Sequence, residues 1–584
     1  MTKKLALVLA ILMVLGLCLT ACQSTPADSA DPTKAPAADT NTGDATTGDD
    51  AATGDDATTD DANTTGDANF NPSGWPVVKE KEELHVLCSR STYAPEDLNE
   101  LYIVQQAEAI TNVHINFESY TGTTYTEKYN IILASGEYPD VISDGMSTLL
   151  QAQYGMDEGV FIKQDELVDT YMTELQRLYD EKPFLRAYGT SADGYLYALP
   201  ELNEGGWMQS GNMQIINTAW LDELGLDMPT DLASFKETLQ AFKDNDCNGN
   251  GDATDEVPLY ALLNLVGYNS ANTGLQNLFS AFGIAMQTSY LDADENGTVF
   301  FQGATEEYKA AIKWFRELAA EGLLSTVGFS SDWDTFNAAF NQEPYQYGVF
   351  GIWEIGDGFT SPNGPIEYDF VPPLKGLNGE DPVTYVNPYP GYNCTKWVIT
   401  RDCEKPYLAA RYADYYYQQD VSLTCIEGAI DGPNPRLIPC TVCNNGRALM
   451  VSTDIPEGMT ILMFRDQNFA SWFPWGVTRA YYDERLHLHF TDRKVQHIDN
   501  QLKLYADPNV VPGLMYTVDE AEEVNQILAD LRDYTNRRGV EWVMGTGDVD
   551  ADWDAYIEEL KAMRMETYVK HAQAAYTRFI EGAK

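Results

Sequence analysis

Hydrophobic and polar positions divide the chain into three stretches of different character. Residues 5–19 form a continuous apolar run, residues 23–75 hold almost no side chain that could be buried, and residues 76–584 are rich in aromatic and aliphatic positions. The last stretch is too long for one compact core, because single cores stop growing at roughly 250–300 residues. The pattern therefore predicts a leader, a linker and a large folded part with at least two lobes.

Within the folded part, short apolar runs alternate with amphipathic stretches. The runs at 85–88, 114–117 and 140–142 predict strands, and a helix is expected between the first two. This βαβ order is typical of a parallel sheet with helices on its faces. Hydrophobic positions at helical spacing predict later helices over 235–242, 306–320, 407–419, 520–535 and 553–581. The fold class predicted from these elements is α/β.

The first 22 residues have the features of an export signal. Lys3 and Lys4 precede the apolar run, which is shorter than the roughly 20 residues needed to cross a bilayer. The tripeptide Leu-Thr-Ala at 19–21, followed by Cys22, resembles the lipobox of bacterial lipoproteins. The resemblance implies that residues 1–21 are removed and that Cys22 is lipid-modified, on the outer face of the cytoplasmic membrane of a Gram-positive cell. The alternative is an ordinary secreted protein with a coincidental cysteine.

Residues 22–75 are interpreted as a disordered acidic tether between the anchor and the folded part. They repeat Thr, Gly, Ala and Asp, and such a segment has too few apolar side chains to form a core. The whole chain carries 89 acidic and 37 basic residues, a formal charge of −52. Nucleic acids and anionic lipids are bound by clustered Lys and Arg, so this balance argues against both as partners. Neutral glycans or peptides fit the charge better.

Signatures of catalysis are scarce in the sequence. There is no Walker loop, no Gly-x-Ser-x-Gly elbow and no His-Glu-x-x-His motif. His487 and His489 are spaced to share one face of a strand, and a solvated polar face is favoured there over a zinc pair. Cys440 and Cys443 have the spacing of a redox or metal half-site, but without a second pair a local disulfide or two free thiols is favoured. We therefore expect no enzyme activity.

One acidic segment carries specific chemistry. From residue 244 to residue 256 oxygen-bearing side chains alternate with glycines, and Ca²⁺ needs about six to eight oxygens from a tightly curled loop. In a first register, which follows an EF-hand loop, Asp244 takes the first position and Asp255 the twelfth. In a second register the ligands are Asp246, Asn248, Asn250, the carbonyl of Asp252, Asp255 and Glu256. We expect one structural Ca²⁺ here, and the alternative is a solvated loop of Asx-turns.

Four segments of the folded part resemble one known family. They read LASGEYPDV (133–141), DGYLYALP (193–200), WLDELGL (220–226) and DEVPL (255–259). In this order they resemble the family 1 extracellular solute-binding proteins, and among these the large lipoproteins that serve carbohydrate ABC transporters. The segments 308–323 and 553–578 are similar to the same branch. The resemblance therefore covers nearly the whole folded part.

The resemblance implies a solute-binding domain at 76–584, with a two-lobed periplasmic-binding-protein-like fold of type II. Its interleaved lobes, joined by hinge strands, are expected at about 80–200 and 370–420 for lobe one, and at about 201–369 and 421–584 for lobe two. Ligand stabilises the closed form of such a protein, because only there do both lobes contact it. The implied function is capture of an oligosaccharide for the permease subunits of an ABC importer, by a monomer that meets the membrane only through its lipid anchor.

A carbohydrate cleft needs aromatic rings for the apolar faces of sugars, and carboxylates or amides for their hydroxyl groups. Eight residues are candidates for these roles: Tyr93, Asp144, Trp207, Trp353, Glu354, Tyr389, Trp472 and Trp475. Trp353 ranks first, because it follows the predicted strand 347–351, where related binding proteins have an aromatic residue facing the cleft. Each aromatic candidate taken alone is about as consistent with a buried core ring. Trp220 is assigned to the core.

Two other functions stay open on the sequence alone. An oligopeptide-binding lipoprotein of similar architecture would direct Asn, Asp and Arg side chains at a peptide backbone in place of stacking rings. A cell-surface glycosidase would need two carboxylates at a defined separation in space, which the sequence does not specify. The identity of the sugar, its chain length and the permease also stay open.

Overall fold

The structure is a computed structural model, and it describes residues 66–267, 274–355, 359–361, 363–389, 391–430, 437–439, 449–451, 461–466, 470, 472–485 and 493–582. All of these residues belong to one compact unit. No helix within them is long and apolar enough to cross a membrane. Some of the sequence-based interpretations concern residues outside the described ranges, namely Cys22, residues 22–65 of the tether, Cys440, Cys443, His487 and His489. The last ten residues of the predicted tether belong to the fold instead, because Phe70 is 2% exposed, packs in the core that contains Val86, and pairs with Val78.

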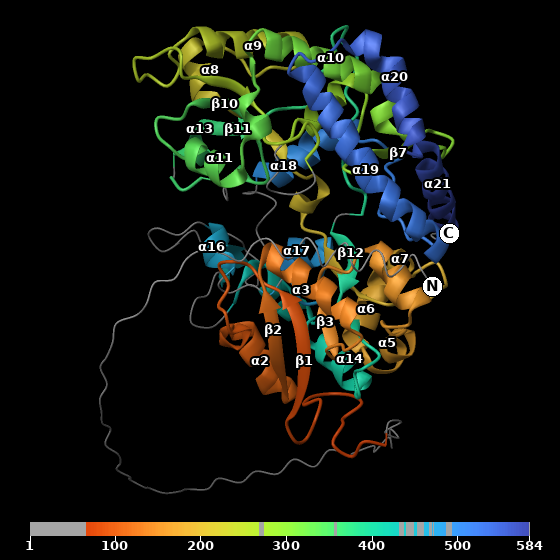
Figure 1. The fold of residues 1–584 in the computed structure, drawn as a ribbon. Helices are drawn as coiled ribbons and strands as arrows, with labels where there is room; N and C mark the ends of the chain where they lie inside the picture. Colours follow the sequence, from red (N-terminus) through yellow and green to blue (C-terminus); the bar gives the residue numbers. More distant parts are fainter. Residues whose placement is uncertain are drawn as a thin grey trace, which may run out of the picture. The chain divides into compact units, whose positions relative to one another are not determined.

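A mixed four-stranded sheet comes first along the chain. Its strands, in spatial order, are β13 (Val398–Ile399), β3 (Val141–Ser143), β1 (Glu82–Ser89) and β2 (Val113–Tyr120). β1 pairs in parallel with both β2 and β3, whereas β13 runs antiparallel to β3. The three strands predicted from the sequence are therefore confirmed, together with their parallel arrangement (Figure 1).

Side chains of β1 alternate between two cores, because successive residues of a strand point to opposite faces of the sheet. Val86 packs in one cluster with α2 (Tyr102–Thr111) and α14 (Pro406–Tyr415), and Leu87 packs in another with α3 (Gly122–Ser135). Both faces of the sheet are thus covered, as is usual for parallel strands.

A second mixed sheet has five strands. Their spatial order is β11 (Tyr368–Phe370), β5 (Met213–Asn217), β10 (Tyr347–Ile352), β6 (Val257–Tyr260) and β9 (Leu324–Ser325). β10 is parallel to β6 and antiparallel to β5. The largest hydrophobic cluster joins this sheet to α9 (Leu232–Asp244), α10 (Glu306–Ala320) and α19 (Val518–Val543). Trp220 belongs to this cluster and is 3% exposed, so its assignment to the core is confirmed.

The predicted helices are present, and their ends follow local backbone chemistry. Asp231 before α9 and Thr517 before α19 each form a capping box, which satisfies backbone N–H groups at the start of the helix. The prediction over 306–320 matches α10. The single helix predicted over 553–581 is instead α20 (Val549–Ala562) and α21 (Met565–Gly582), because Arg564 between them has a left-handed φ of 68°.

A three-stranded sheet links segments that are distant in sequence. β12 (Tyr392–Lys396) runs antiparallel to β4 (Leu199–Asn203), and β16 (Gly476–Val477) runs parallel to β4 on its other side. β4 follows the helices of the first sheet and precedes β5 of the second. This small sheet therefore lies on the path of the chain between the two larger ones.

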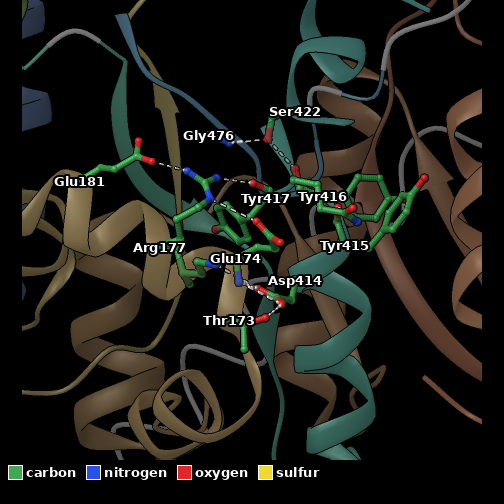
Figure 2. Close-up of polar contacts among 12 residues, drawn as sticks. Thr173, Glu174, Arg177, Glu181, Asp414, Tyr415, Tyr416, Tyr417, Ser422 and Gly476 are labelled. Atoms are coloured by element: carbon green, nitrogen blue, oxygen red, sulfur yellow. Dashed lines mark hydrogen bonds and ion pairs between the residues drawn. The ribbon is translucent and has the colours of Figure 1, made fainter. Parts of the chain in front are cut away.

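Polar contacts connect β16 to the hydrophobic core that contains Val86 and α14, as Figure 2 shows. The hydroxyl of Ser422 donates to the carbonyl of Tyr416 at 2.6 Å and accepts from the backbone N–H of Gly476 at 3.1 Å. Nearby, the Asp414 carboxylate accepts from the first backbone N–H groups of α6 (Thr173–Glu181), with distances of 3.0 and 3.1 Å. Burial raises the pKa of Asp414 to about 6 although these bonds oppose the rise. Asp414 is thus a structural cap inside the core.

The other elements are mostly short. The remaining α-helices are α4 (Thr148–Leu150), α5 (Asp165–Tyr171), α7 (Pro183–Gly189), α8 (Thr218–Leu224), α11 (Trp333–Phe340), α13 (Gly364–Glu367), α15 (Gln419–Glu427), α16 (Ile461–Asp466), α17 (Arg479–Arg485) and α18 (Arg493–Asn500). Two further hairpins pair β7 (Leu291–Ala293) with β8 (Val299–Phe301), and β14 (Leu437–Pro439) with β15 (Leu449–Val451). The 3₁₀ and π segments are η1 (Leu98–Glu100), η2 (Gln151–Asp157), η3 (Gly206–Gln209), η4 (Gln276–Phe282), η5 (Gln302–Ala304), η6 (Val327–Ser330) and η7 (Leu502–Tyr505).

Candidate functional site

The carboxyl ends of β1, β2 and β3 lie at one edge of the first sheet, because the three strands are parallel. Open α/β sheets bind their ligands at this edge, in the crevice formed by the loops there. Arg90 directly follows β1 and Asp144 directly follows β3. Tyr93, in the loop after β1, is 42% exposed. Two of the predicted site residues, Tyr93 and Asp144, are therefore brought to the same edge.

Asp144 is held in an uncommon backbone conformation. Its φ is 98°, a region that residues other than glycine seldom occupy, and such strain is often found at functional sites. The hydroxyl of Tyr125 donates to the Asp144 carbonyl at 2.8 Å and helps to hold the turn. One carboxylate oxygen, Oδ1, lies 2.8 Å from Lys396 Nζ, and the side chain is still 31% exposed. The turn therefore presents a carboxylate that is both anchored and accessible.

Lys396 lies between two carboxylates on the three-stranded sheet. Its Nζ is 2.8 Å from Asp144 Oδ1 and 3.1 Å from Glu201 Oε2, and its side chain is 7% exposed. Burial alone would lower the pKa of Lys396, but the charges of Glu201 and Asp144 raise it, so the ammonium group stays charged. Burial also raises the pKa of Glu201, and Lys396 opposes that rise. β4 and β12 thereby place the ammonium group of Lys396 next to the loop after β3.

Trp353, the residue ranked first from the sequence, follows β10 and is half-buried. Lys494, a fully buried residue of α18, donates from Nζ to the Trp353 carbonyl at 2.7 Å and lies 3.7 Å from the centre of the indole ring. One face of the ring is therefore covered by a cation–π contact. The neighbouring Glu354 is half-buried too, and its Oε1 accepts from the backbone N–H of Ile355 at 3.0 Å.

Trp207 lies on η3 and is half-buried. Its ring meets Tyr482 edge to face, with 5.2 Å between the ring centres. The same α18 lysine that contacts Trp353 also donates to the carbonyl of Gly211 at 3.2 Å, just beyond η3. α18 therefore supports the segments that carry Trp207 and Trp353, two predicted residues that are distant in sequence.

Tyr389 lies in a cluster of rings. It stacks on Phe184 of α7, with 4.7 Å between ring centres, and contacts Phe579 of α21 edge on at 5.5 Å. Tyr188 and Tyr392 complete the cluster. These contacts use much of the Tyr389 ring for packing between α7 and the C-terminal helix.

Trp472 and Trp475 are buried in the hydrophobic core on one face of the first sheet. They are 3% and 1% exposed and belong to the same cluster as Val86 of β1. Neither indole Nε1 has a hydrogen-bond partner among the described residues. The carbonyl of Trp472 accepts from Ser143 Oγ of β3 at 2.5 Å, so its backbone, rather than its ring, lies next to Asp144.

The acidic loop predicted to bind Ca²⁺ is closed by its own hydrogen bonds. The Asp246 carboxylate accepts from the backbone N–H of Asn250 at 3.1 Å and of Gly251 at 2.9 Å. Asp255 Oδ2 accepts from Asn250 Nδ2 at 2.7 Å and from Gln346 Nε2 at 2.6 Å. Burial opposes the charge of Asp255, but its hydrogen bonds outweigh this and lower its pKa. In this loop the described residues include no ready-made group of three His, Cys, Asp or Glu side chains for a metal.

Glu256 faces this loop, whereas Asp244 turns back onto its own helix. Glu256 Oε1 accepts from the backbone N–H of Cys247 at 2.9 Å, and its Oε2 is buried without a hydrogen-bond partner among the described residues. The Asp244 carboxylate accepts from Gln240 Nε2 at 2.8 Å, at the end of α9. A buried acceptor without a donor is what a cation would satisfy, and it belongs to the second register.

The sequence did not point to four charged residues of this region, namely Arg90, Lys396, Glu201 and Lys494. A charged residue among apolar neighbours was the available signal for Glu201 in β4, whereas β12 is largely polar and offered no such signal for Lys396. The partner of such a charged residue depends on which strands pair, and the paired residues of β4 and β12 are about 200 positions apart in the chain.

Comparisons with known proteins identify the family of this chain. The sequence profile of a family described as bacterial extracellular solute-binding protein matches residues 102–430, more than half of the chain. The fructooligosaccharide ABC transporter substrate-binding protein FusA of Streptococcus pneumoniae is 28% identical over 513 residues, which are 86% of this chain and 91% of FusA. Lipoprotein LipO of Bacillus subtilis is 30% identical over 289 residues, 45% of this chain and 52% of LipO.

Solved structures give the same result. FusA of S. pneumoniae in complex with kestose is similar with a TM-score of 0.74 at 28% identity, over 85% of this chain and 99% of that chain. A FusA EF-hand mutant in complex with fructo-nystose has a TM-score of 0.73 at 27% identity, with the same coverage. The two-lobed α/β fold predicted from the sequence is therefore confirmed.

Proposed function

This chain belongs to the family of bacterial extracellular solute-binding proteins, and on that premise we propose that it captures an oligosaccharide outside the cell for an ABC importer. The observation that carries the proposal is the similarity to FusA, which extends over 86% of this chain. The chain is a substrate-binding protein and not an enzyme, because the family and the relatives that match along its length are substrate-binding proteins.

The edge of the first sheet has the chemistry that such a ligand needs. Sugar hydroxyl groups donate and accept hydrogen bonds, and sugar rings present apolar C–H faces. Asp144 offers a partly exposed carboxylate, and Tyr93 offers an exposed ring in the adjacent loop. Trp353 and Trp207, held by α18, are the next residues we assign to the ligand. Closure of the two lobes around the sugar would produce the form that the permease recognises.

Thermal unfolding of the protein with a ligand panel tests this function. The panel contains kestose, nystose, an unrelated neutral oligosaccharide, an acidic oligosaccharide and short peptides. A ligand at about a thousand times its Kd raises the free energy of unfolding by about 4 kcal/mol, which is readily seen. We expect a shift with an oligosaccharide. A shift with peptides alone would favour the oligopeptide-binding alternative, and release of sugar products would show a glycosidase.

The lipid anchor forms a second part of the proposed function. The basic start, the short apolar run and the tripeptide before Cys22 support a lipoprotein signal. A monomer anchored in this way would stay near its permease on the outer face of the membrane. Replacing Cys22 with Ser should release the protein from the membrane fraction into the medium. Retention of the Cys22→Ser protein in the membrane would show that another feature anchors it.

A structural Ca²⁺ in the loop at 246–256 is the third part. The FusA structure described as an EF-hand mutant supports it, as does the buried Glu256 oxygen that lacks a donor. The residues of the second register would hold the ion: Asp246, Asn248, Asn250, Asp252 through its carbonyl, Asp255 and Glu256. Bound Ca²⁺ would neutralise their charge and fix the turn between α9 and β6.

A further inference from the structure

Arg90 is an arginine without a carboxylate partner in a strongly acidic chain. The sequence has 89 acidic residues for 37 basic ones, yet no described acidic side chain forms an ion pair with Arg90. Its Nη1 donates to the carbonyl of Ala94 at 3.4 Å, which is a long hydrogen bond, and its Nε is buried with no partner in the described structure. Most of the five donors of this guanidinium group are thus unused.

Other arginines without an ion pair are satisfied differently. Arg316 donates to the carbonyl oxygens of Gly547 at 2.7 Å and of Trp542 at 3.3 Å. Arg401 lies 5.2 Å from the centre of the Tyr138 ring and is exposed to water. Arg90 has only the one long hydrogen bond to the Ala94 carbonyl, so the fold makes little use of its charge.

The strand register places Arg90 and Asp144 at the same end of the sheet. Cys88 of β1 pairs with Ser143 of β3. Asp144 is the residue after Ser143, and Arg90 lies two residues after Cys88. Both charges act on the buried thiol of Cys88: burial and Asp144 raise its pKa, and Arg90 lowers it. A donor-only group and an acceptor-only group therefore share the carboxyl edge of the sheet.

The carboxylate of Asp144 has capacity left for a ligand. Lys396 occupies Oδ1, and no other hydrogen bond to this carboxylate is present among the described residues. A hydroxyl group can donate to Asp144 while a neighbouring hydroxyl group accepts from Arg90. The four side chains Arg90, Lys396, Asp144 and Glu201 have no net charge together, so a neutral ligand leaves them balanced, whereas a carboxylate ligand adds an uncompensated charge beside Asp144.

We propose that Arg90 is a ligand-binding residue that, together with Asp144, recognises two neighbouring hydroxyl groups of a neutral sugar. The proposal rests on the proposed function, because it assumes that the ligand is an oligosaccharide. Lys396 is then a positioning residue, which fixes the Asp144 carboxylate without contacting the sugar.

Calorimetric titration of the protein tests this pair, with kestose as the neutral probe and trigalacturonate as the acidic probe. Hydrogen bonds to charged groups are strong, so Arg90→Met and Asp144→Asn should each weaken kestose binding by about tenfold or more. Arg90→Lys keeps the charge but loses the fork of donors, and should bind with intermediate affinity. The double variant should lose less than the product of the two single losses, because both residues hold one hydroxyl pair. Arg401→Met is the matched control and should bind as the wild type does.

The outcomes separate the two claims. If the wild type binds no oligosaccharide of the panel, the proposed function fails and this inference fails with it. If the wild type binds kestose and Arg90→Met binds it equally well, only the inference is overturned. Tighter binding of trigalacturonate than of kestose by the wild type would also overturn it, since Arg90 would then serve a carboxylate. Melting curves of each variant confirm that any loss of affinity is not a loss of fold.

Discussion

The carboxyl edge of the first sheet and the loop at 246–256 both gather oxygen-rich side chains, but they balance the charge differently. At the edge, a buried lysine of the protein lies between Asp144 and Glu201. In the loop, the acceptors bond to backbone and amide N–H groups, and Glu256 keeps one buried oxygen without a donor. The edge carries its own cation and suits a neutral polar ligand, whereas the loop suits an added cation.

In a third region, a proton offsets the charge of two adjacent carboxyl groups, Asp292 and Asp507. Asp292 of β7 is 3% exposed and accepts from Gln302 Nε2 at 3.0 Å. Burial, with the adjacent Asp507 carboxyl group, raises the pKa of Asp292 to about 7. A lysine, a proton and, as proposed, a Ca²⁺ ion are therefore three ways to balance clustered acidic groups in one chain.

Removal of Ca²⁺ is expected to have the largest effect. If the loop binds Ca²⁺ with a micromolar Kd, millimolar Ca²⁺ adds about 4 kcal/mol to the free energy of unfolding, and EDTA should remove it. Unfolding in denaturant with Ca²⁺ and with EDTA measures the difference. Identical curves under the two conditions would leave the loop as a metal-free turn.

Two variants decide the register of this site. Glu256→Gln keeps the oxygen that accepts from the Cys247 N–H but removes the charge, and should abolish most of the effect of EDTA. Asp244→Asn is the matched control, because its carboxylate bonds to Gln240 within α9. An effect of Asp244→Asn as large as that of Glu256→Gln would support the first register instead.

Lys396→Met should destabilise the fold by about 3 kcal/mol, because it leaves the Glu201 carboxylate buried without a cation. The pKa of Glu201 is raised by burial, so protonation at low pH should recover part of the loss. Chemical unfolding at neutral and at acidic pH measures both effects. Lys405→Met is the control: Lys405 also pairs with two acids, Asp67 and Glu82, but it is 37% exposed and should cost less than about 1 kcal/mol. Equal losses for the two lysines would remove the special role of Lys396.

Asp292 should make stability fall as the pH rises toward 7. Its folded-state pKa lies above the ordinary value of 3.8, so the native state holds a proton that the unfolded chain releases, and this stabilisation is lost as the pH rises through about 7. The slope reaches about 1.4 kcal/mol per pH unit. Asp292→Asn should remove this part of the pH dependence in unfolding experiments from pH 5 to pH 8, whereas the exposed Glu295→Gln should not. Parallel curves for wild type and Asp292→Asn would show that no proton is shared.

Trp353→Ala should have the smallest effect, about 1 kcal/mol or close to fivefold in affinity for kestose. One face of the ring already lies against Lys494, so a sugar has only the other face to stack on. Trp75→Ala is the control, because Trp75 also has a cation, Arg411, over its ring at 4.7 Å but is not assigned to the ligand. Unchanged kestose affinity of Trp353→Ala in calorimetry would remove this residue from the site.

Much of the fold follows from local patterns, and the failures have physical reasons. The strands at 85–88, 114–117 and 140–142 and the helix at 306–320 were predictable from side-chain periodicity. The break at Arg564 was not, because a left-handed residue in an amphipathic stretch leaves the hydrophobic pattern unchanged. The lobe boundaries stay a prediction, although Trp472 and Trp475 pack with the core of the first sheet rather than with the second.

The sequence by itself determined the α/β elements and the family, and it predicted the export signal, the acidic tether and the candidate Ca²⁺ loop, because each depends on neighbouring residues or on motif order. Only the tertiary structure decided which charges meet. Asp144 and Lys396 are 252 positions apart, and Lys494 reaches Trp353 across 141 positions. Periodicity carries no information on such contacts, since they depend on how strands pair and where helices pack. The charge balance at the carboxyl edge of the first sheet is therefore a property of the fold and not of any single segment.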